Sequence, residues 1–151
     1  MALGIGMEVV AYDVQPDTAF QPGPGFRFAS LEEVVGQADF LSLHCPPAPD
    51  GKPLIDEAAF GRMKRGVYLV NTARHDLVDA VALAGQLARG HVAGAALDVF
   101  DAEPPADRAL ARSPHVVATP HVGAYTSQSV DRAVRMAVDN LLEALRETEA
   151  V

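Results

Sequence analysis

The sequence has few of the residues that form disulfide bonds or metal-binding sites. Cys45 is the single cysteine among 151 residues, and tryptophan does not occur. One cysteine cannot form a disulfide within the chain or supply a cysteine-rich zinc site. The sequence also has no His-x-x-x-His spacing, so we expect no metal site. A Gly-x-Ser-x-Gly elbow is missing too, which leaves serine-hydrolase chemistry without its nucleophile.

Long apolar runs and excess positive charge are also lacking. No run approaches the roughly 18 apolar residues of a membrane-spanning helix, and no basic segment precedes an apolar one at the N-terminus. The 12 basic residues are outnumbered by 20 acidic ones, for a net charge of −8. That balance argues against nucleic acid or an anionic membrane as the main partner. We therefore expect a soluble, cytoplasmic protein.

Hydrophobic residues make up 49% of the chain, which is enough for one globular domain. Short apolar runs alternate with helical patterns, and residues 15–26 form a loop rich in proline and glycine. The expected strands lie at residues 8–13, 39–44, 67–71, 93–99 and 115–119. The expected helices lie at residues 30–37, 56–63, 79–88 and 127–147. This alternation predicts an α/β fold, a doubly wound parallel sheet with helices on both faces.

Polar residues follow each of the expected strands. They are Asp13, the segment 44–46, the segment 71–74, Asp98 and the segment 119–121. The carboxyl ends of parallel strands share one edge of the sheet, where α/β folds bind their ligands. The sequence therefore predicts a site that combines an acid, an arginine and a histidine.

Three of these side chains suggest a chemistry, although each also has an ordinary structural explanation. Arg74 can bind a carboxylate through two parallel N–H donors, or it can pair with Asp76 or Asp79 at the surface. His121 can exchange a proton near neutral pH, with Glu103 to orient its ring, or it can bond a buried carbonyl. Asp13 can accept hydrogen bonds from ribose hydroxyls and favour NAD over NADP, or it can cap a turn.

Several segments, in order, resemble the D-isomer-specific 2-hydroxyacid dehydrogenases, which include phosphoglycerate dehydrogenases and hydroxypyruvate reductases. The matching segments are residues 6–13 (GMEVVAYD), 43–46 (LHCP), 63–74 (MKRGVYLVNTAR), 94–100 (GAALDVF) with Glu103 and Pro104, and 119–124 (TPHVGA). Each segment alone is a weak signal. Together they cover most of the chain and predict a Rossmann-like NAD-binding fold.

The resemblance implies a role for each candidate residue. Arg74 would hold the carboxylate of a small 2-oxo or 2-hydroxy acid, His121 would move the proton, and Glu103 would pair with His121. The implied cofactor-binding residues are Asp13, His44, Cys45, Pro46, Thr72, Ala73, Asp98 and Gly123. The cofactor would be NAD, whose nicotinamide carries the hydride. A homodimer is the implied assembly.

Two residues depart from the family's pattern. His75 stands where the family usually has glycine after the arginine, and a glycine there allows backbone geometry that histidine resists. Ala48 stands where a threonine is usual, two residues past Pro46, so one hydroxyl contact is missing.

The family's Gly-x-Gly-x-x-Gly turn and its strand are expected upstream of Met1, as is most of a substrate-binding domain. We therefore expect an N-terminally truncated fold that lacks its glycine-rich first β-α unit. The strand order 3-2-1-4-5-6 predicts a gap between the Asp13 strand and the strand at 67–71. Residues 1–125 would form a partial NAD-binding domain. Residues 126–151 would form a helix that returns toward the substrate domain.

Three functions remain open on the sequence. The first is an NAD-dependent oxidoreductase that interconverts a D-2-hydroxy acid and its 2-oxoacid by hydride transfer. The second is a truncated, catalytically inactive module with the same fold. The third is a binding protein that senses NAD(H), as fold alone does not decide function.

Overall fold

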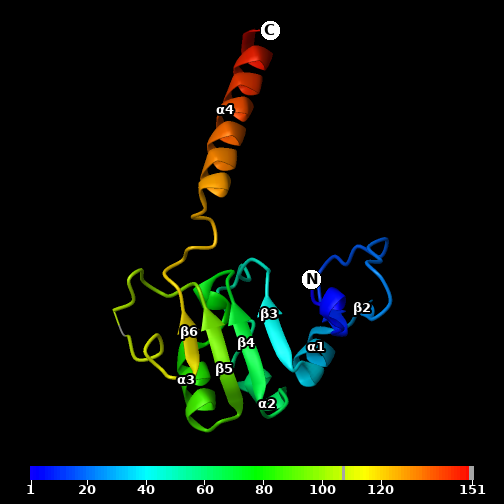
Figure 1. The fold of residues 1–151 in the computed structure, drawn as a ribbon, viewed down its shortest axis with the longest axis vertical. Helices are drawn as coiled ribbons and strands as arrows, with labels where there is room; N and C mark the ends of the chain where they lie inside the picture. Colours follow the sequence, from blue (N-terminus) through cyan, green and yellow to red (C-terminus); the bar gives the residue numbers. More distant parts are fainter. Residues whose placement is uncertain (107, 150–151) are drawn as a thin grey trace.

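The fold, seen in a computed structural model, consists of two parallel sheets and their helices (Figure 1). The structure describes residues 1–106 and 108–149, so the last two residues of the expected 126–151 helix lie outside the described residues. The smaller sheet pairs β1 (Val9–Ala11) with β2 (Phe26–Phe28). The larger sheet has the order β3-β4-β5-β6. Its strands are β3 (Phe40–Leu43), β4 (Val67–Asn71), β5 (Val92–Leu97) and β6 (Val116–Ala118).

The helices begin at side-chain caps that the sequence makes visible. Helix α1 (Leu31–Gln37) starts after Ser30, whose hydroxyl accepts the Glu33 N–H at 3.2 Å. Helix α2 (Glu57–Arg62) starts after Asp56, and α3 (Ala80–Ala88) starts after Asp79. Side-chain oxygens at these positions satisfy N–H groups that have no partner inside the first turn. A short 3-10 helix, His75–Leu77, follows β4.

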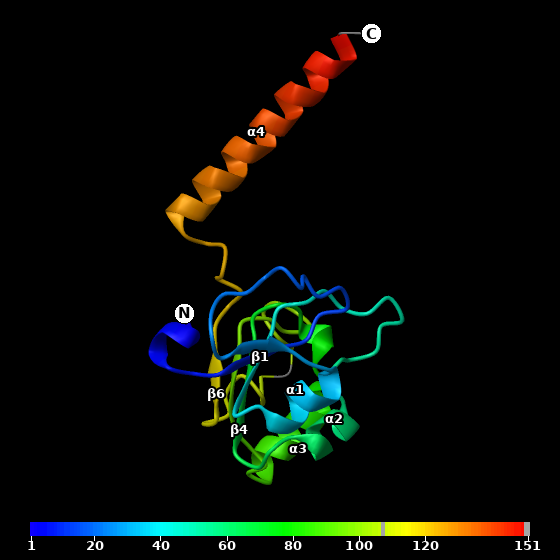
Figure 2. The ribbon, with the colours of Figure 1, turned by 90° about the vertical axis from the view of Figure 1, so that its right-hand side faces the viewer.

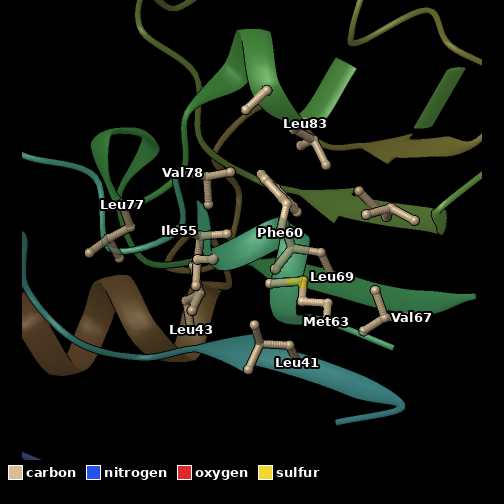
Figure 3. Packing of buried hydrophobic residues seen from close by; sticks show 14 of the residues in the cluster. Leu41, Leu43, Ile55, Phe60, Met63, Val67, Leu69, Leu77, Val78 and Leu83 are labelled. Carbon is tan, nitrogen blue, oxygen red and sulfur yellow. The ribbon is translucent and has the colours of Figure 1, made fainter. Parts of the chain in front are cut away.

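The core lies between the larger sheet and helices α1–α3, which Figure 2 shows together on one side of the sheet. Alternate residues of the strands point toward these helices, as the pleat of a strand requires. In Figure 3, Leu41 and Leu43 of β3 face Phe60 and Met63, and Leu69 of β4 is fully buried. The core therefore anchors β3, β4 and β5 as one rigid frame.

The opposite face of the larger sheet is open over the described residues. Phe40 and Tyr68 stack there with ring centroids 5.1 Å apart, yet remain 57% and 46% exposed. Gly94 lies beside this pair, and a Cβ added to it would come within 3.3 Å of the Tyr68 ring. The expectation of helices on both faces thus holds for one face of this sheet, the one that α1–α3 cover.

The expected place of the gap in the sheet is wrong by one strand. β3, not β4, is the edge strand of the larger sheet, and β4 pairs with it from Phe40–Tyr68 to Leu43–Asn71. The reason is β2, which begins at Phe26, the last residue of the expected loop, and was not counted as a strand. When β2 is counted as a strand, each strand after it takes the next later number in the expected strand order. The gap then falls between β1 and β3.

Helix α4 (Ser127–Glu149) projects from the rest of the chain (Figures 1 and 2). The helix has 23 residues, and its apolar side is exposed from Val130 to Leu145. The exposed apolar residues of α4 are Val130, Val134, Met136, Val138, Leu141, Leu142 and Leu145. In the described part of the chain, no helix is both long and apolar enough to cross a membrane.

The cap of α3 yields a first prediction. The Asp79 carboxylate accepts the N–H groups of Val81 and Ala82, both at 3.0 Å. We expect Asp79→Ala to lower the free energy of unfolding by about 1 kcal/mol, the usual cost of losing such a cap. Urea denaturation measures the change. Asp79→Asn keeps the accepting oxygen and should stay close to the wild type; equal losses in both variants would contradict the capping role.

Candidate functional site

The carboxyl ends of β3, β4, β5 and β6 meet at one edge, because all neighbouring strands in this sheet are parallel. Each strand is followed there by one group of expected site residues. His44, Cys45 and Pro46 follow β3, and Thr72, Ala73 and Arg74 follow β4. Asp98 follows β5, and the His121 turn follows β6 (Figure 1). The structure thus brings these four groups to the edge that the sequence predicts.

His121 and Glu103 form the closest pair of the expected catalytic residues. Nδ1 of His121 lies 2.8 Å from Oε1 and 3.0 Å from Oε2 of Glu103. Both side chains are 43% exposed, so the pair lies at the surface of the site. The carboxylate engages one ring nitrogen, which orients the imidazole and directs Nε2 away from Glu103. This geometry suits a proton donor and acceptor at Nε2.

The backbone of His121 is in the left-handed region, with φ of 54°. Residues other than glycine rarely adopt this conformation, and they keep it where surrounding contacts impose it. The contacts here come from Asp98, which is 5% exposed. Its carboxylate accepts the N–H groups of Val122 at 2.9 Å and Gly123 at 3.1 Å. Asp98 therefore fixes the turn directly after His121.

The Thr119 hydroxyl also donates to the Asp98 carboxylate, at 2.5 Å. This bond is the largest cause that lowers the pKa of Asp98 from its ordinary value of 3.8. The N–H groups of Val122 and Gly123 and the nearby His121 lower the pKa further, while burial opposes them. The ionised carboxylate is thus the form that holds the His121 turn. The family resemblance implies that Asp98 and Gly123 bind the cofactor. The structure shows in addition that the Asp98 carboxylate accepts the N–H of Gly123.

Arg74 lies on a short turn between β4 and the 3-10 helix. It is exposed, and its Nη1 donates to the carbonyl oxygen of Ala73 at 2.6 Å. The guanidinium therefore lies along the turn that carries Arg74. The Glu103 carboxylate contacts His121 and not Arg74. His75 begins the 3-10 helix and has no positive φ. The backbone after Arg74 thus accommodates histidine without the conformation reserved for glycine.

Two residues that the sequence reasoning did not assign to the site help to shape it. Thr119 donates to Asp98, and the buried amide of Asn71 contacts the main chain of Ala73 and Arg74. In the sequence both are polar residues at strand ends, but the residues beside them in the chain do not indicate these hydrogen-bond partners. The contact between Thr119 and Asp98 joins two different strands, so only the fold reveals it.

The remaining expected residues lie on the side of β1 and β3. Asp13 follows β1, is exposed, and accepts the Gln15 N–H at 2.8 Å. His44 lies 2.8 Å from the Ser42 hydroxyl through Nε2, and Cys45 and Pro46 are exposed beside it. Asp13 therefore belongs to the smaller sheet, whereas His44, Cys45 and Pro46 belong to the larger one.

The donor and acceptor groups that follow the strands of the two sheets fit a nicotinamide dinucleotide. The exposed Asp13 carboxylate matches a ribose diol, which needs hydrogen-bond acceptors. Asp98 uses three of the roughly four acceptor positions of a carboxylate, which leaves room for one further donor such as an amide. Thr72 adds an exposed hydroxyl after β4.

The lowered pKa of Asp98 leads to a prediction about stability. A native pKa below 3.8 gives a contribution to the free energy of unfolding that is present above 3.8 and lost as the pH falls through the lowered value. Asp98→Asn should cost about 1–3 kcal/mol at neutral pH. Below pH 3.8 the difference between wild type and variant should shrink.

Denaturant unfolding of both proteins across this pH range measures the effect. Thr119→Val, which removes the largest cause of the shift, should reproduce part of the loss, and Thr119→Ser should restore the wild-type behaviour. A difference between wild type and Asp98→Asn that stays constant with pH would show that the carboxylate charge does not stabilise the native turn.

Comparison with known proteins places this chain in a family. Residues 1–123 match the family described as D-isomer specific 2-hydroxyacid dehydrogenase, NAD binding domain. The D-3-phosphoglycerate dehydrogenase of Mycobacterium tuberculosis (strain ATCC 25618 / H37Rv) is 44% identical over 128 residues. That match covers 85% of this chain and 24% of the relative, so the chain spans about a quarter of the relative's length.

Two solved structures share the fold over nearly the whole chain. The NAD complexed form of D-isomer specific 2-hydroxyacid dehydrogenase from Lactobacillus delbrueckii ssp. bulgaricus has a TM-score of 0.84 and 34% identity, with 95% of this chain and 48% of that one covered. D-lactate dehydrogenase from Aquifex aeolicus, complexed with NAD and lactic acid, has a TM-score of 0.83 and 33% identity, with 96% and 48% covered.

The family model matches more than half of the chain, and the relatives named above are at least 33% identical to it. The chain belongs to the D-isomer specific 2-hydroxyacid dehydrogenase family and carries the fold of its NAD binding domain.

Proposed function

We propose that this chain is the NAD-binding and proton-transferring part of an oxidoreductase that interconverts a D-2-hydroxy acid and its 2-oxoacid. The contact between His121 and Glu103 carries the proposal, because it orients one ring nitrogen and leaves the other to face a substrate. Arg74 follows the strand two places away in the same sheet, at the same edge. An imidazole and a guanidinium at one edge suit a substrate with a carboxylate beside a carbonyl.

Each of the three catalytic residues has a distinct task. Bound NADH would supply the hydride that reduces the C2 carbonyl. His121 gives the C2 oxygen its proton from Nε2 during reduction and takes the proton back during oxidation. Glu103 holds the ring through Nδ1 and leaves Nε2 to exchange the proton. Arg74 binds the substrate carboxylate through its N–H groups and polarises the neighbouring carbonyl, which requires its side chain to leave the Ala73 carbonyl.

The cofactor would lie across the strand ends. Asp13 would accept the hydroxyls of the adenosine ribose, and a 2′-phosphate would meet its negative charge. The segment of His44, Cys45 and Pro46 would line the adenosine side. On the nicotinamide side we place Thr72, Ala73, Asp98 and Gly123.

Residues 1–125 form the NAD-binding domain in this proposal, and the 126–151 segment returns toward a substrate-binding domain. The exposed apolar side of α4 supports this assignment, because such a surface is stabilised by burial. The coverage of 95% and 96% of this chain in the two solved relatives supports it too, since it extends into the projecting helix. Both solved chains are about twice as long as the part they share with this one.

We further infer a homodimer that acts in the cytoplasm on a small 2-oxo or 2-hydroxy acid, with neither nucleic acid nor a membrane as a partner. The net charge of −8 supports the absence of a polyanionic partner. The exposed, unbridged thiol of Cys45 suits a reducing compartment. Light scattering of the intact protein measures the assembly, and a monomeric mass would contradict the dimer.

The roles of His121 and Arg74 are testable in the intact gene product. We expect His121→Gln and Arg74→Lys each to lower kcat/KM for the 2-oxoacid by at least about 100-fold, as the loss of a proton donor or a two-point carboxylate contact predicts. The dissociation constant of NADH should stay within about twofold. His115→Gln is the matched control, because His115 lies exposed at the other end of β6.

Steady-state NADH oxidation at 340 nm in a series of 2-oxoacids provides the measurement. Unchanged turnover in either variant contradicts its assigned role. Tight NADH binding with no turnover of any 2-oxoacid by the wild type would favour the sensing or inactive alternatives.

The cofactor preference gives a separate prediction for Asp13. A carboxylate near the 2′ position repels the phosphate of NADPH, so Asp13→Asn should reduce the preference for NADH by about tenfold, roughly the 1.4 kcal/mol of one repulsive contact. Fluorescence titration of both cofactors measures the ratio. Asp17→Asn, in the exposed loop after β1, is the control. An unchanged ratio in Asp13→Asn would remove Asp13 from the ribose site.

A further inference from the structure

Asn71 is the last residue of β4 and one of the most buried polar residues, with 1% exposure. Both ends of its side-chain amide are engaged. Oδ1 accepts the Ala73 N–H at 3.1 Å, and Nδ2 donates to the Arg74 carbonyl oxygen at 2.8 Å. A buried amide whose donor and acceptor are both satisfied locally stabilises one conformation of the backbone around it.

These two bonds close the turn that presents Arg74. The Arg74 carbonyl also accepts the Leu77 N–H at 3.3 Å, so it is held from both sides. Beyond it, Ile55 pairs with Val78 in a parallel bridge, which fixes the chain after the 3-10 helix. The Arg74 backbone therefore has little freedom, although its guanidinium is exposed.

The main chain of Asn71 joins this turn to the His121 side of the site. Its carbonyl oxygen accepts the Asp98 N–H at 3.0 Å. The Asp98 carboxylate in turn holds the N–H groups of Val122 and Gly123. Asn71 therefore sits at the junction of the two turns that carry Arg74 and His121.

We propose that Asn71 is a positioning residue, whose side chain holds Arg74 where its guanidinium can bind the substrate carboxylate in register with His121. The proposal rests on the function proposed above. Asn71 is too buried to contact substrate, so it acts through Arg74. When a mutation away from the chemistry misplaces a binding group by about 1 Å, the rate can fall about 100-fold, so a side chain that prevents such a shift affects activity.

Three variants of the intact protein test the proposal. Asn71→Ala removes both hydrogen bonds, and Asn71→Asp keeps an acceptor for the Ala73 N–H while losing the donor to the Arg74 carbonyl. Val67→Ala is the matched control, because Val67 is equally buried on the same strand but lies at the opposite end from Asn71. Melting temperatures allow variants of equal stability loss to be compared.

We expect Asn71→Ala to raise KM for the 2-oxoacid by about tenfold or more, with the NADH dissociation constant within about twofold. Val67→Ala should lower the melting temperature without raising KM. In an Arg74→Ala background, the Asn71→Ala change should have no further effect on KM, because it acts through that arginine. An equal rise in KM for Val67→Ala, or full additivity with Arg74→Ala, would overturn the proposal.

Amide hydrogen exchange provides a readout that needs no activity. The Ala73 N–H lies outside any helix or strand, so its protection reports the bond to Oδ1 of Asn71. We expect protection in the wild type and in Asn71→Asp, and its loss in Asn71→Ala. Exchange at Ala73 that is the same in wild type and Asn71→Ala overturns the proposal. A wild type without turnover but with Ala73 protected would instead count against the proposed function.

Discussion

The buried carboxylate of Asp98 is the contact on which the geometry of the site depends. It accepts one hydroxyl and two main-chain N–H groups from the segment that follows β6. These bonds impose the left-handed backbone at His121, which would otherwise be unfavourable for that residue. With the backbone fixed, one carboxylate contact from Glu103 suffices to orient the imidazole. This cluster of hydrogen bonds thus fixes the turn that presents His121 to Glu103.

The parallel sheet determines which residues can cooperate. Its strands end at one edge, so residues separated by more than 40 positions in the chain, such as Arg74 and His121, reach the same edge after strands that lie two places apart in the sheet. The frame is rigid because β3, β4 and β5 pack against α1–α3 through one apolar core. Two turns at the edge are then held by buried polar side chains: Asn71 holds the turn of Arg74, and Asp98 holds the turn of His121.

Two apolar surfaces of the described residues remain exposed, the open face of the larger sheet and the apolar side of α4. Burial of apolar area contributes about 25 cal/mol per Å² to stability, so covering either surface would stabilise the protein. The chain matches about a quarter of its phosphoglycerate dehydrogenase relative and about half of the two solved chains.

The sequence by itself determined the fold class, most element positions and the edge at which the site lies. Apolar alternation at 67–71 and caps such as Ser30 and Asp79 are local signals, so they can be read without the fold. Family resemblance supplied the roles of the site residues. Only the tertiary structure decided that β2 pairs with β1, that Asp98 holds the His121 turn and that Asn71 holds the Arg74 turn. The turn bonds depend on which strand ends meet and how each polar group is buried, and no residue pattern along the chain encodes that proximity.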